Sequence, residues 1–258
     1  MKKITLGILG GLGPMSSVYF YEMLTSHTKA STDQEHLDIL LSSRATTPDR
    51  TGFILGTSAH DPLPAMEEEA KKLEAAGAQL LAISCNTAHC FYEGIQNSVN
   101  IPIISIIKMT AEHCKALGVK KVGLLATEGT VASGAYKSVL DGFCIECEVC
   151  TLEEQSIITD IIYGQIKKGI APDIEAFLKV TDALKARGCE RIILGCTELS
   201  LLKKTNNIGS GFIDSLEVLA LCAIRLCGKE TQGFDNELEG FCVPDILSQN
   251  RKGNPKCC

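Results

Sequence analysis

The stretches KKLEAAGAQLLAISCNTAH (residues 71–89) and DALKARGCERIILGCTELS (residues 182–200) share one pattern of residue types. Each stretch consists of an amphipathic helical pattern, a glycine, an apolar run with strand character, and then a cysteine. Gly77 and Gly188 stand where the C-terminal end of a helix favours glycine. We infer that the chain has two halves of similar construction, and that each half ends a buried strand in a thiol.

Short apolar runs alternate with helical patterns along the whole chain. The expected strands are residues 4–10, 37–43, 79–84, 101–105, 121–126, 144–150, 191–195 and 211–215. Crossover helices are expected between most of them, for example at 61–78 and 172–188. Strands that are apolar throughout and separated by helices indicate parallel sheets covered on both faces. The prediction is an α/β protein whose first half is 1–106 plus 215–258 and whose second half is 107–214.

The composition excludes several classes of protein. With 258 residues, 45% of them hydrophobic and 22% charged, the chain can bury a substantial core. Its net charge of -6 and the lack of a basic stripe argue against nucleic acid as a partner. The sequence has no run of about 18 apolar residues, which is the length that a membrane-spanning helix needs. A soluble enzyme or binding protein is therefore expected.

The thirteen cysteines are scattered through apolar segments of a long chain. A disulfide framework instead has regularly spaced cysteines in a short secreted chain, so a reducing cytoplasmic location is predicted. The run ITLGILGGLG after Met1, Lys2 and Lys3 is short and meets Pro14, which favours a first buried strand over a signal peptide. We expect the terminal pair Cys257 and Cys258 to be a loose tail rather than a lipidation site.

Cys85 and Cys196 follow the two matching strands. Ligands of open α/β sheets bind outside the carboxyl ends of the strands, so both thiols are expected to face one cleft. A helix that starts at such a strand end favours negative charge and lowers the pKa of a thiol there, which would make each cysteine a usable base. Packing in the core is the alternative for a single cysteine, but the matching pair favours function. His89 could polarise Cys85 or serve as a capping or packing residue.

The glycine-rich stretch GILGGLGPMSS (residues 7–17) follows a strand and opens a helix. The dinucleotide fingerprint would need glycine where Ser16 stands, and the Gly-Lys-Ser/Thr of a P-loop is absent. The stretch is consistent with a tight turn whose amides hold a small anion such as a carboxylate, or with a turn that needs glycine for packing alone.

Two further groups of residues are candidates for binding. Arg44 and Arg50 lie in a polar loop after the second expected strand, where an arginine can hold a carboxylate with two parallel hydrogen bonds. Cys144, Cys147 and Cys150 have the spacing of a cluster-binding run, but Glu154 stands where an iron–sulfur site needs a fourth cysteine. No metal site is predicted there.

The stretches GILGGLGPMSS (7–17), TTPDRT (46–51), SCNTAH (84–89) and LGCTELS (194–200) together resemble the aspartate/glutamate racemase family, most closely its aspartate racemase branch. The resemblance runs from about residue 4 to about residue 226. It implies two flavodoxin-like halves with the active site in the cleft between them. It also implies racemisation without pyridoxal phosphate or metal, and a homodimer.

The resemblance assigns Cys85 and Cys196 as the two catalytic bases, one on each face of the α-carbon. The substrate contacts that it implies are Gly11, Met15, Arg50, Asn86, Thr87, Thr130, Lys167, Thr197 and Glu198. Arg50 matches the arginine that holds a substrate carboxylate, and Lys167 supplies a second positive contact. Oriented donors of this kind stabilise the charge that develops when an α-proton leaves.

Substrate preference depends on the second cysteine motif. Glutamate racemases carry Cys-Thr-His there, whereas this chain has Cys196-Thr197-Glu198. The resemblance therefore favours aspartate as the small acidic substrate, with Glu198 as a proton partner, although some relatives accept both amino acids. Two other functions stay open on the sequence: a non-catalytic sensor of acidic metabolites, and a redox protein with a disulfide between Cys85 and Cys196.

Overall fold

The N-terminal part of the chain forms a parallel four-stranded sheet with the strand order β2-β1-β3-β4. The structure is a computed structural model, and it describes residues 4–248. The strands of this sheet are β1 (Thr5–Gly10), β2 (Asp38–Ser43), β3 (Leu80–Ile83) and β4 (Ile103–Ile104). The two central strands β1 and β3 are almost wholly buried, which explains their continuous apolar sequence.

The second sheet repeats this topology with the order β6-β5-β7-β8. Its strands are β5 (Lys121–Leu125), β6 (Glu146–Val149), β7 (Arg191–Leu194) and β8 (Phe212–Asp214). In both sheets the cysteine-bearing strand, β3 or β7, lies beside the strand that begins the unit. The predicted α/β fold with two similar parallel sheets is confirmed.

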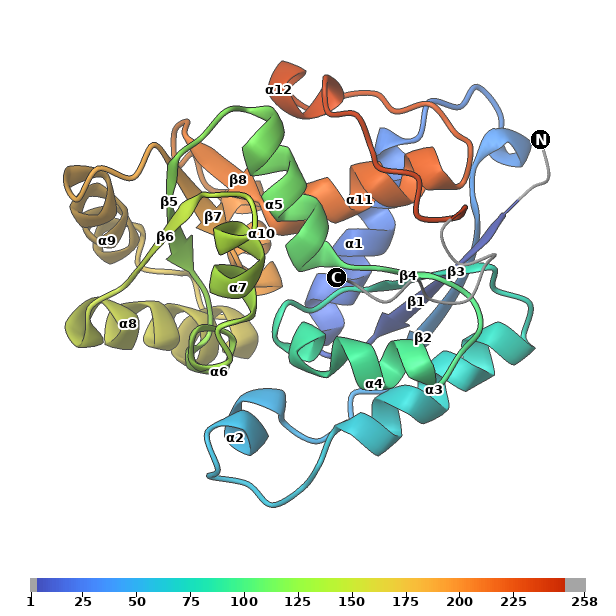
Figure 1. Ribbon diagram of the computed structural model, residues 1–258, viewed down its shortest axis with the longest axis horizontal. Coiled ribbons are helices and arrows are strands. Elements are labelled where there is room, and N and C mark those ends of the chain that lie inside the picture. Colours follow the sequence, from blue (N-terminus) through green and yellow to red (C-terminus); the bar gives the residue numbers. More distant parts are fainter. Residues whose placement is uncertain (1–3, 249–258) are drawn as a thin grey trace.

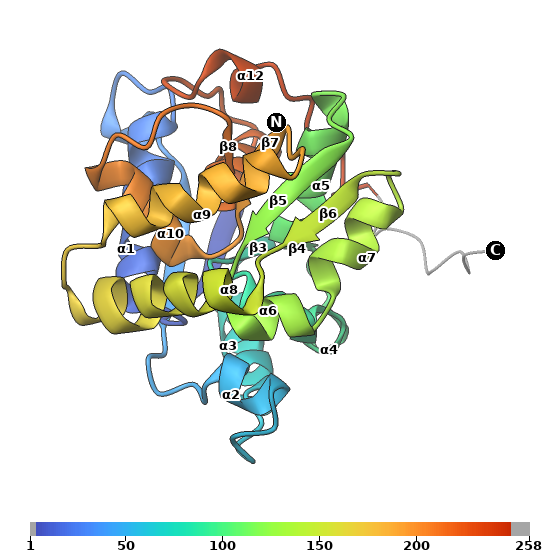
Figure 2. The ribbon, with the colours of Figure 1, turned by 90° about the vertical axis from the view of Figure 1, so that its left-hand side faces the viewer.

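Helices connect the strands and cover both faces of each sheet (Figures 1 and 2). In the first half they are α1 (Pro14–His27), α2 (Arg50–Ile54), α3 (Leu63–Ala75) and α4 (Tyr92–Asn97), with short 3-10 segments η1 (Asp33–Glu35) and η2 (Thr87–Phe91). Those that follow are α5 (Ile106–Ala116), α6 (Glu128–Ala132), α7 (Ala135–Asp141), α8 (Leu152–Thr159), the π-helix η3 (Asp160–Gln165), the 3-10 segment η4 (Ile166–Lys168), α9 (Ile174–Ala186), α10 (Thr197–Thr205), α11 (Ser215–Leu226) and α12 (Asn236–Glu239).

Helices α5 and α11 lie between the two sheets (Figure 1). Their buried side chains share one apolar cluster with residues of both sheets, such as Ile8 of β1 and Ile193 of β7. Smaller clusters cover the other faces, where α3 packs on the first sheet and α8 and α9 pack on the second. One apolar cluster includes residues of both halves. The predicted boundaries of the two halves, at residues 106 and 215, therefore stay a prediction. The predicted tail cysteines lie outside the described residues.

The two glycines that follow the long helices have the predicted role. Gly77 and Gly188 adopt φ values of 103° and 87°, one residue beyond the caps of α3 and α9. A positive φ is readily available only to glycine, and it turns the chain from the helix into the next strand. A glycine with positive φ thus leads from α3 toward β3 and from α9 toward β7.

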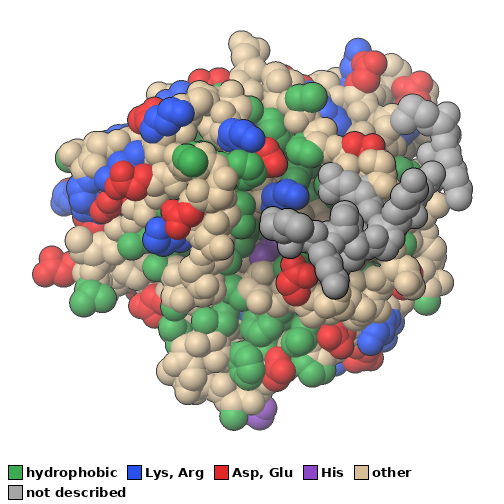
Figure 3. Space-filling view, viewed as in Figure 1, with side chains coloured by type: hydrophobic (Ala, Val, Ile, Leu, Met, Phe, Trp, Pro, Cys, Tyr) green, Lys and Arg blue, Asp and Glu red, His purple; other side chains and the backbone are tan. Residues whose placement is uncertain are grey.

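Charges of both signs are interspersed over the face of the molecule in Figure 3, and no continuous basic patch crosses that face. Within residues 4–248, every helix is too short or too polar to cross a membrane.

Candidate active site

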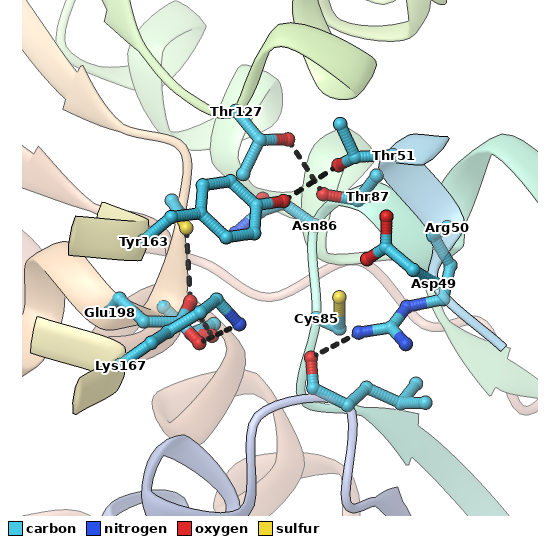
Figure 4. A pocket seen from close by; sticks show the side chains of 13 residues that line it. Asp49, Arg50, Thr51, Cys85, Asn86, Thr87, Thr127, Tyr163, Lys167 and Glu198 are labelled. Carbon is cyan, nitrogen blue, oxygen red and sulfur yellow. Dashed lines mark hydrogen bonds and ion pairs between the residues drawn. The ribbon is translucent and has the colours of Figure 1, made fainter. Parts of the chain in front are cut away.

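A pocket lies at the carboxyl ends of the central strands of both sheets. Figure 4 shows that Cys85 and Arg50 face it from one side and that Tyr163, Lys167 and Glu198 face it from the other. The side chains that line it are Leu12, Asp49, Arg50, Thr51, Cys85, Asn86, Thr87, Thr127, Tyr163, Lys167, Cys196, Thr197 and Glu198. The structure therefore brings eight of the predicted site residues together, namely Arg50, Cys85, Asn86, Thr87, Lys167, Cys196, Thr197 and Glu198.

The first cysteine turn begins where β3 ends. Cys85 is 6% exposed and is followed by the 3-10 segment η2, not by the α-helix that the sequence suggested. The cause is His89, whose Nδ1 lies 2.8 Å from the Cys85 carbonyl oxygen, while its backbone N–H donates to the Asn86 carbonyl. The ring thus satisfies a carbonyl that the amide of an α-helix would otherwise satisfy.

His89 is a structural residue. Its Nε2 accepts a hydrogen bond from the backbone N–H of Ile106, the first residue of α5, at 3.1 Å. Its Nδ1 therefore carries the proton and donates it to the Cys85 carbonyl. Burial lowers the pKa of His89 to about 4, so the ring is neutral at physiological pH. Because both ring nitrogens are bound to backbone groups, capping is the role of this histidine in the structure.

The second cysteine turn carries a charged network. Cys196 is 5% exposed, and its thiol donates a hydrogen bond to Glu198 Oε2 at 3.0 Å. The other oxygen of Glu198 lies 2.7 Å from the Lys167 ammonium nitrogen. Burial lowers the pKa of Lys167, but the adjacent carboxylate outweighs burial and the pKa is raised. Lys167 is thus a permanent cation of the pocket.

The pKa of Cys196 is raised well above its ordinary value, first by burial and then by the negative charge of Glu198. The sequence predicted a lowered pKa at this position, and for Cys196 that prediction is wrong. The helix dipole of α10 favours the thiolate, but desolvation and a carboxylate in hydrogen-bond contact oppose it more strongly. Cys196 is therefore a protonated thiol in the resting protein.

Three threonine hydroxyls meet at the back of the pocket. Thr87 Oγ1 lies 2.9 Å from the hydroxyls of both Thr127 and Thr130, and those two are 3.0 Å apart. Thr127 lines the pocket, whereas the predicted contact Thr130 lies behind it. Sequence reasoning missed Thr127, although its place just after β5 is a signal, because β5 ends at the same edge as β7.

The guanidinium of Arg50 is held at the rim by backbone carbonyls. Its Nη2 donates to Leu12 at 2.7 Å and its Nη1 donates to Pro48 at 3.1 Å. The buried Nε has no hydrogen-bond partner within residues 4–248, and no carboxylate of that range forms an ion pair with Arg50. Arg44 differs, because it forms ion pairs with Glu68 and Glu69 outside the pocket.

Tyr163 and Thr51 join the two sides of the pocket, and sequence reasoning missed both. The Tyr163 hydroxyl donates to Thr51 Oγ1 at 2.8 Å, and the Lys167 ammonium lies 5.4 Å from the centre of the Tyr163 ring. A Cβ on Gly129 would lie 2.9 Å from the Thr51 Cα, so glycine permits α2 to approach α6 this closely. The π-helix that places Tyr163 leaves no signal in the sequence.

Gly11 and Met15 lie outside the pocket. Gly11 has a φ of 78°, and its N–H is already bound to the Ser17 hydroxyl at 2.9 Å. Met15 is 65% exposed and lines an adjoining cavity of about 610 Å³, which also contacts Lys167 and Glu198. The amide of Gly11 thus serves the turn itself, and the prediction that it binds substrate is left without support from the contacts.

Residues 4–248 contain no cluster of three or more His, Cys, Asp or Glu side chains that could hold a metal ion. In the run of three cysteines, Cys144 is exposed, and Cys147 and Cys150 are half-buried at β6 and just after it. All cysteines of the described range, including Cys85 and Cys196, are free thiols.

Two similar parallel sheets with a thiol at the carboxyl edge of each, and one pocket that both thiols line, define a two-lobed α/β protein with a cleft site. Residues 9–223 match the Asp/Glu/Hydantoin racemase family. The chain belongs to this family.

Individual relatives agree with this assignment. The structure of Picrophilus torridus aspartate racemase superposes with a TM-score of 0.77 at 31% identity, covering 89% of this chain and 96% of that one. The broad specificity amino-acid racemase RacX of Bacillus subtilis (strain 168) is 33% identical over 53% of this chain and 60% of its own length. The glutamate racemase of Listeria monocytogenes serotype 4a (strain HCC23) is 33% identical over 64% of this chain and 66% of its own length. The chain thus matches less than two thirds of the length of either of these curated relatives.

Proposed function

We propose that this protein is a cofactor-independent amino-acid racemase that interconverts L- and D-aspartate with the Cys85 and Cys196 thiols as its two bases. The observation that carries this proposal is their placement: both end corresponding strands of corresponding sheets and line the same pocket. Inversion of an α-carbon requires that a proton leaves one face and that another arrives at the opposite face. A thiol from each half of the protein meets that requirement without turning the substrate.

The proton balance closes with these two side chains alone. For one enantiomer, the Cys85 thiolate takes the α-proton, and the electron pair of the broken C–H bond stays on the carbon. That pair then accepts the proton of the Cys196 thiol on the opposite face. Cys85 ends as a thiol and Cys196 as a thiolate, and the other enantiomer reverses both roles. The protonated resting state of Cys196 supports its role as the first donor.

The charges of the pocket suit a dicarboxylate. Arg50 offers a guanidinium that no carboxylate of residues 4–248 neutralises, and Lys167 offers an ammonium on the opposite wall (Figure 4). Lys167 is already paired with Glu198, so a substrate carboxylate must share or replace that contact. Interactions of charged groups in such a site are worth about 1.5–3 kcal/mol each. They would also hold the negative charge that develops as the α-proton leaves.

The choice of aspartate rests on two observations. The pocket is small, and Glu198 occupies part of its wall. A structural relative that covers 89% of this chain at 31% identity is an aspartate racemase. A broader enzyme that also accepts glutamate is the second candidate, because curated relatives at 33% identity include a glutamate racemase and a broad-specificity racemase.

The test is incubation of dialysed protein, free of pyridoxal phosphate, with L-aspartate in D2O under reducing conditions. We expect loss of optical rotation together with entry of deuterium at the α-position. The variants Cys85→Ser and Cys196→Ser should each abolish the loss of rotation. A wild-type protein that neither racemises nor exchanges the α-proton would instead support a binding role such as a metabolite sensor, and the proposal would be wrong.

L-Glutamate in a parallel reaction tests the substrate. Glutamate turnover at the rate of aspartate would replace aspartate racemase with the broader enzyme and leave the two-thiol chemistry intact. The chemistry needs both thiols reduced, which fits the predicted cytoplasmic location. Assembly as a homodimer likewise stays a prediction, and equilibrium sedimentation of the purified protein tests it.

A further inference from the structure

A buried chain of hydrogen bonds links the two cysteine turns through a residue outside the pocket. Asn86, which directly follows Cys85, donates from Nδ2 to the hydroxyl of Ser215 at 3.0 Å. Ser215 donates in turn to the backbone carbonyl of Leu194 at 2.7 Å. Leu194 lies two residues before Cys196. The Ser215 side chain, at the start of α11, thus connects the two thiol-bearing segments, which belong to different sheets.

The direction of each hydrogen bond in this chain is fixed. The Leu194 carbonyl can only accept a hydrogen bond, so the Ser215 hydroxyl donates its one proton to it. The Ser215 oxygen must therefore accept from the Asn86 amide. This orients the amide so that Oδ1 accepts from the hydroxyl of Tyr136, at 2.6 Å. Asn86, Tyr136, Leu194 and Ser215 are all at most 2% exposed. A buried network of this kind, with its partners satisfied, is rigid and permits one arrangement.

A second contact also joins the two cysteine turns. Thr197, which directly follows Cys196, points its hydroxyl at the carbonyl of Ser84, which directly precedes Cys85, at 3.5 Å. This contact is longer and therefore weaker than the Ser215 hydrogen bonds. No strand pairing joins the two sheets within residues 4–248, since each pairs only internally. The separation of the two thiols therefore depends on side-chain contacts between the turns.

We propose that Ser215 is a positioning residue that sets the separation of the Cys85 and Cys196 thiols, and this rests on the proposed two-thiol function. A two-base inversion needs both sulfur atoms in line with the α-carbon at the same moment. A displacement of about 1 Å can cost 10²-fold in rate. Exchange of the α-proton on one face needs only one correctly placed sulfur, so it is less sensitive to their separation.

The experiment compares Ser215→Ala with the wild-type full-length protein in D2O, starting from each enantiomer of aspartate. Chiral chromatography measures inversion, and proton NMR measures α-deuterium in the unreacted enantiomer. We expect kcat for inversion to fall about 30-fold to 100-fold, with KM within about 3-fold. We define the ratio as the rate of α-deuterium exchange with retention of configuration divided by the rate of inversion. This ratio should rise at least 10-fold, because one thiolate can take the α-proton, exchange it with solvent and return deuterium to the same face. An unchanged ratio would overturn the proposal.

The control is Thr181→Val, which also removes a wholly buried hydroxyl that donates to a carbonyl, that of Leu178 in its own helix α9, at 2.9 Å. Its ratio should equal that of the wild type. A raised ratio in this control would overturn the proposal, because general loosening would then account for the effect.

A second variant covers the case in which Ser215→Ala does not fold. Tyr136→Phe removes only the hydroxyl that donates to Asn86 Oδ1, and it should raise the ratio of exchange to inversion about 3-fold. A wild-type ratio in this variant would overturn the proposal. Failure of the proposed function is recognised separately, since the wild-type protein would then show neither inversion nor exchange.

Discussion

The two cysteine turns have the same backbone origin and different chemistry. Cys85 and Cys196 are equally buried at the ends of corresponding strands. The residues that follow Cys85 in its own turn are neutral: the amide of Asn86, the hydroxyl of Thr87 and the ring of His89, while the Arg50 guanidinium faces the pocket from the same side (Figure 4). Cys196 instead donates to a carboxylate that is paired with an ammonium.

The difference shows that a repeated fold element need not give a repeated site. The positions four residues after the two cysteines are an example. His89 bonds back to the Cys85 carbonyl, whereas Ser200 donates to the buried Asp214 at 2.7 Å. The first turn is therefore fixed by a neutral ring. The second turn is fixed by Asp214 of β8, and its charges are those of Glu198, on α10 itself, and of Lys167. The two thiols should consequently respond differently to substitution.

The largest effect is expected from removing either sulfur. Cys85→Ser and Cys196→Ser should each lower racemisation at least about 10³-fold, because a hydroxyl is a far weaker acid than a thiol. Each variant should still exchange the α-proton of one enantiomer, and the two variants should differ in which one. Deuterium incorporation from separate L- and D-aspartate samples checks this. Exchange from the same enantiomer in both variants would contradict the assignment of one thiol to each face.

Glu198→Gln should have the second largest effect and should act on the second turn alone. Its negative charge raises the pKa of Cys196, and its loss also frees the Lys167 cation, so the pKa of Cys196 should fall. We expect racemisation to fall about 100-fold because a neutral amide no longer keeps Cys196 protonated, and the protonated thiol is the form that donates to the α-carbon. Mass spectrometry of iodoacetamide-treated protein at several pH values should show faster alkylation of Cys196 below pH 8.

The matched control for that substitution is Glu68→Gln, which removes a carboxylate from a surface ion pair outside the pocket. It should leave both racemisation and the alkylation of Cys196 unchanged. Slower alkylation of Cys196 in the Glu198 variant would show that the carboxylate does not hold the thiol proton.

His89 should make the first turn sensitive to acid. Its pKa is about 4 in the folded protein, because burial disfavours the charged ring, against 6.5 for an ordinary histidine. The unfolded chain therefore binds a proton between these values while the folded protein does not, so stability is lost as pH falls through this window. The loss from pH 7 to pH 5 is about 2 kcal/mol. Urea unfolding at both pH values measures it.

His89→Gln is the comparison for this effect, since glutamine keeps polar atoms and cannot titrate. The variant should be less stable than the wild type at pH 7. Between pH 7 and pH 5, however, its free energy of unfolding should fall by about 2 kcal/mol less than that of the wild type. An equal loss in both proteins would mean that the ring is protonated, or freely solvated, in the folded state.

The smallest effect is expected where the two sides of the pocket are joined. Tyr163→Phe and Thr51→Val each remove one partner of the 2.8 Å hydrogen bond that seats α2, and with it Arg50, on the second half. Each should raise KM for aspartate about 5-fold, about 1 kcal/mol, with kcat within about 2-fold. The double variant should be no worse than either single variant. Additive increases in KM would show that the two residues act separately.

The α/β fold, the pairing of the two cysteine turns and most residues of the pocket can be predicted from the sequence. These follow from local patterns: apolar runs of strand length, glycine after each long helix, and polar residues where a strand ends. Because parallel strands of one sheet end at one edge, such residues meet wherever the fold forms.

The interactions among the pocket residues, in contrast, depend on how the elements pack in three dimensions. The carboxylate of Glu198 contacts Lys167 and Cys196, Tyr163 reaches Thr51, and Ser215 connects the two turns. Except for Cys196 and Glu198, which are two residues apart, these contacts join residues from different elements. Their geometry depends on packing between elements that no local pattern specifies. The raised pKa of Cys196 is the clearest case, since the helix start and Glu198 were visible in the sequence, whereas the burial of the thiol and its hydrogen bond to the carboxylate were not.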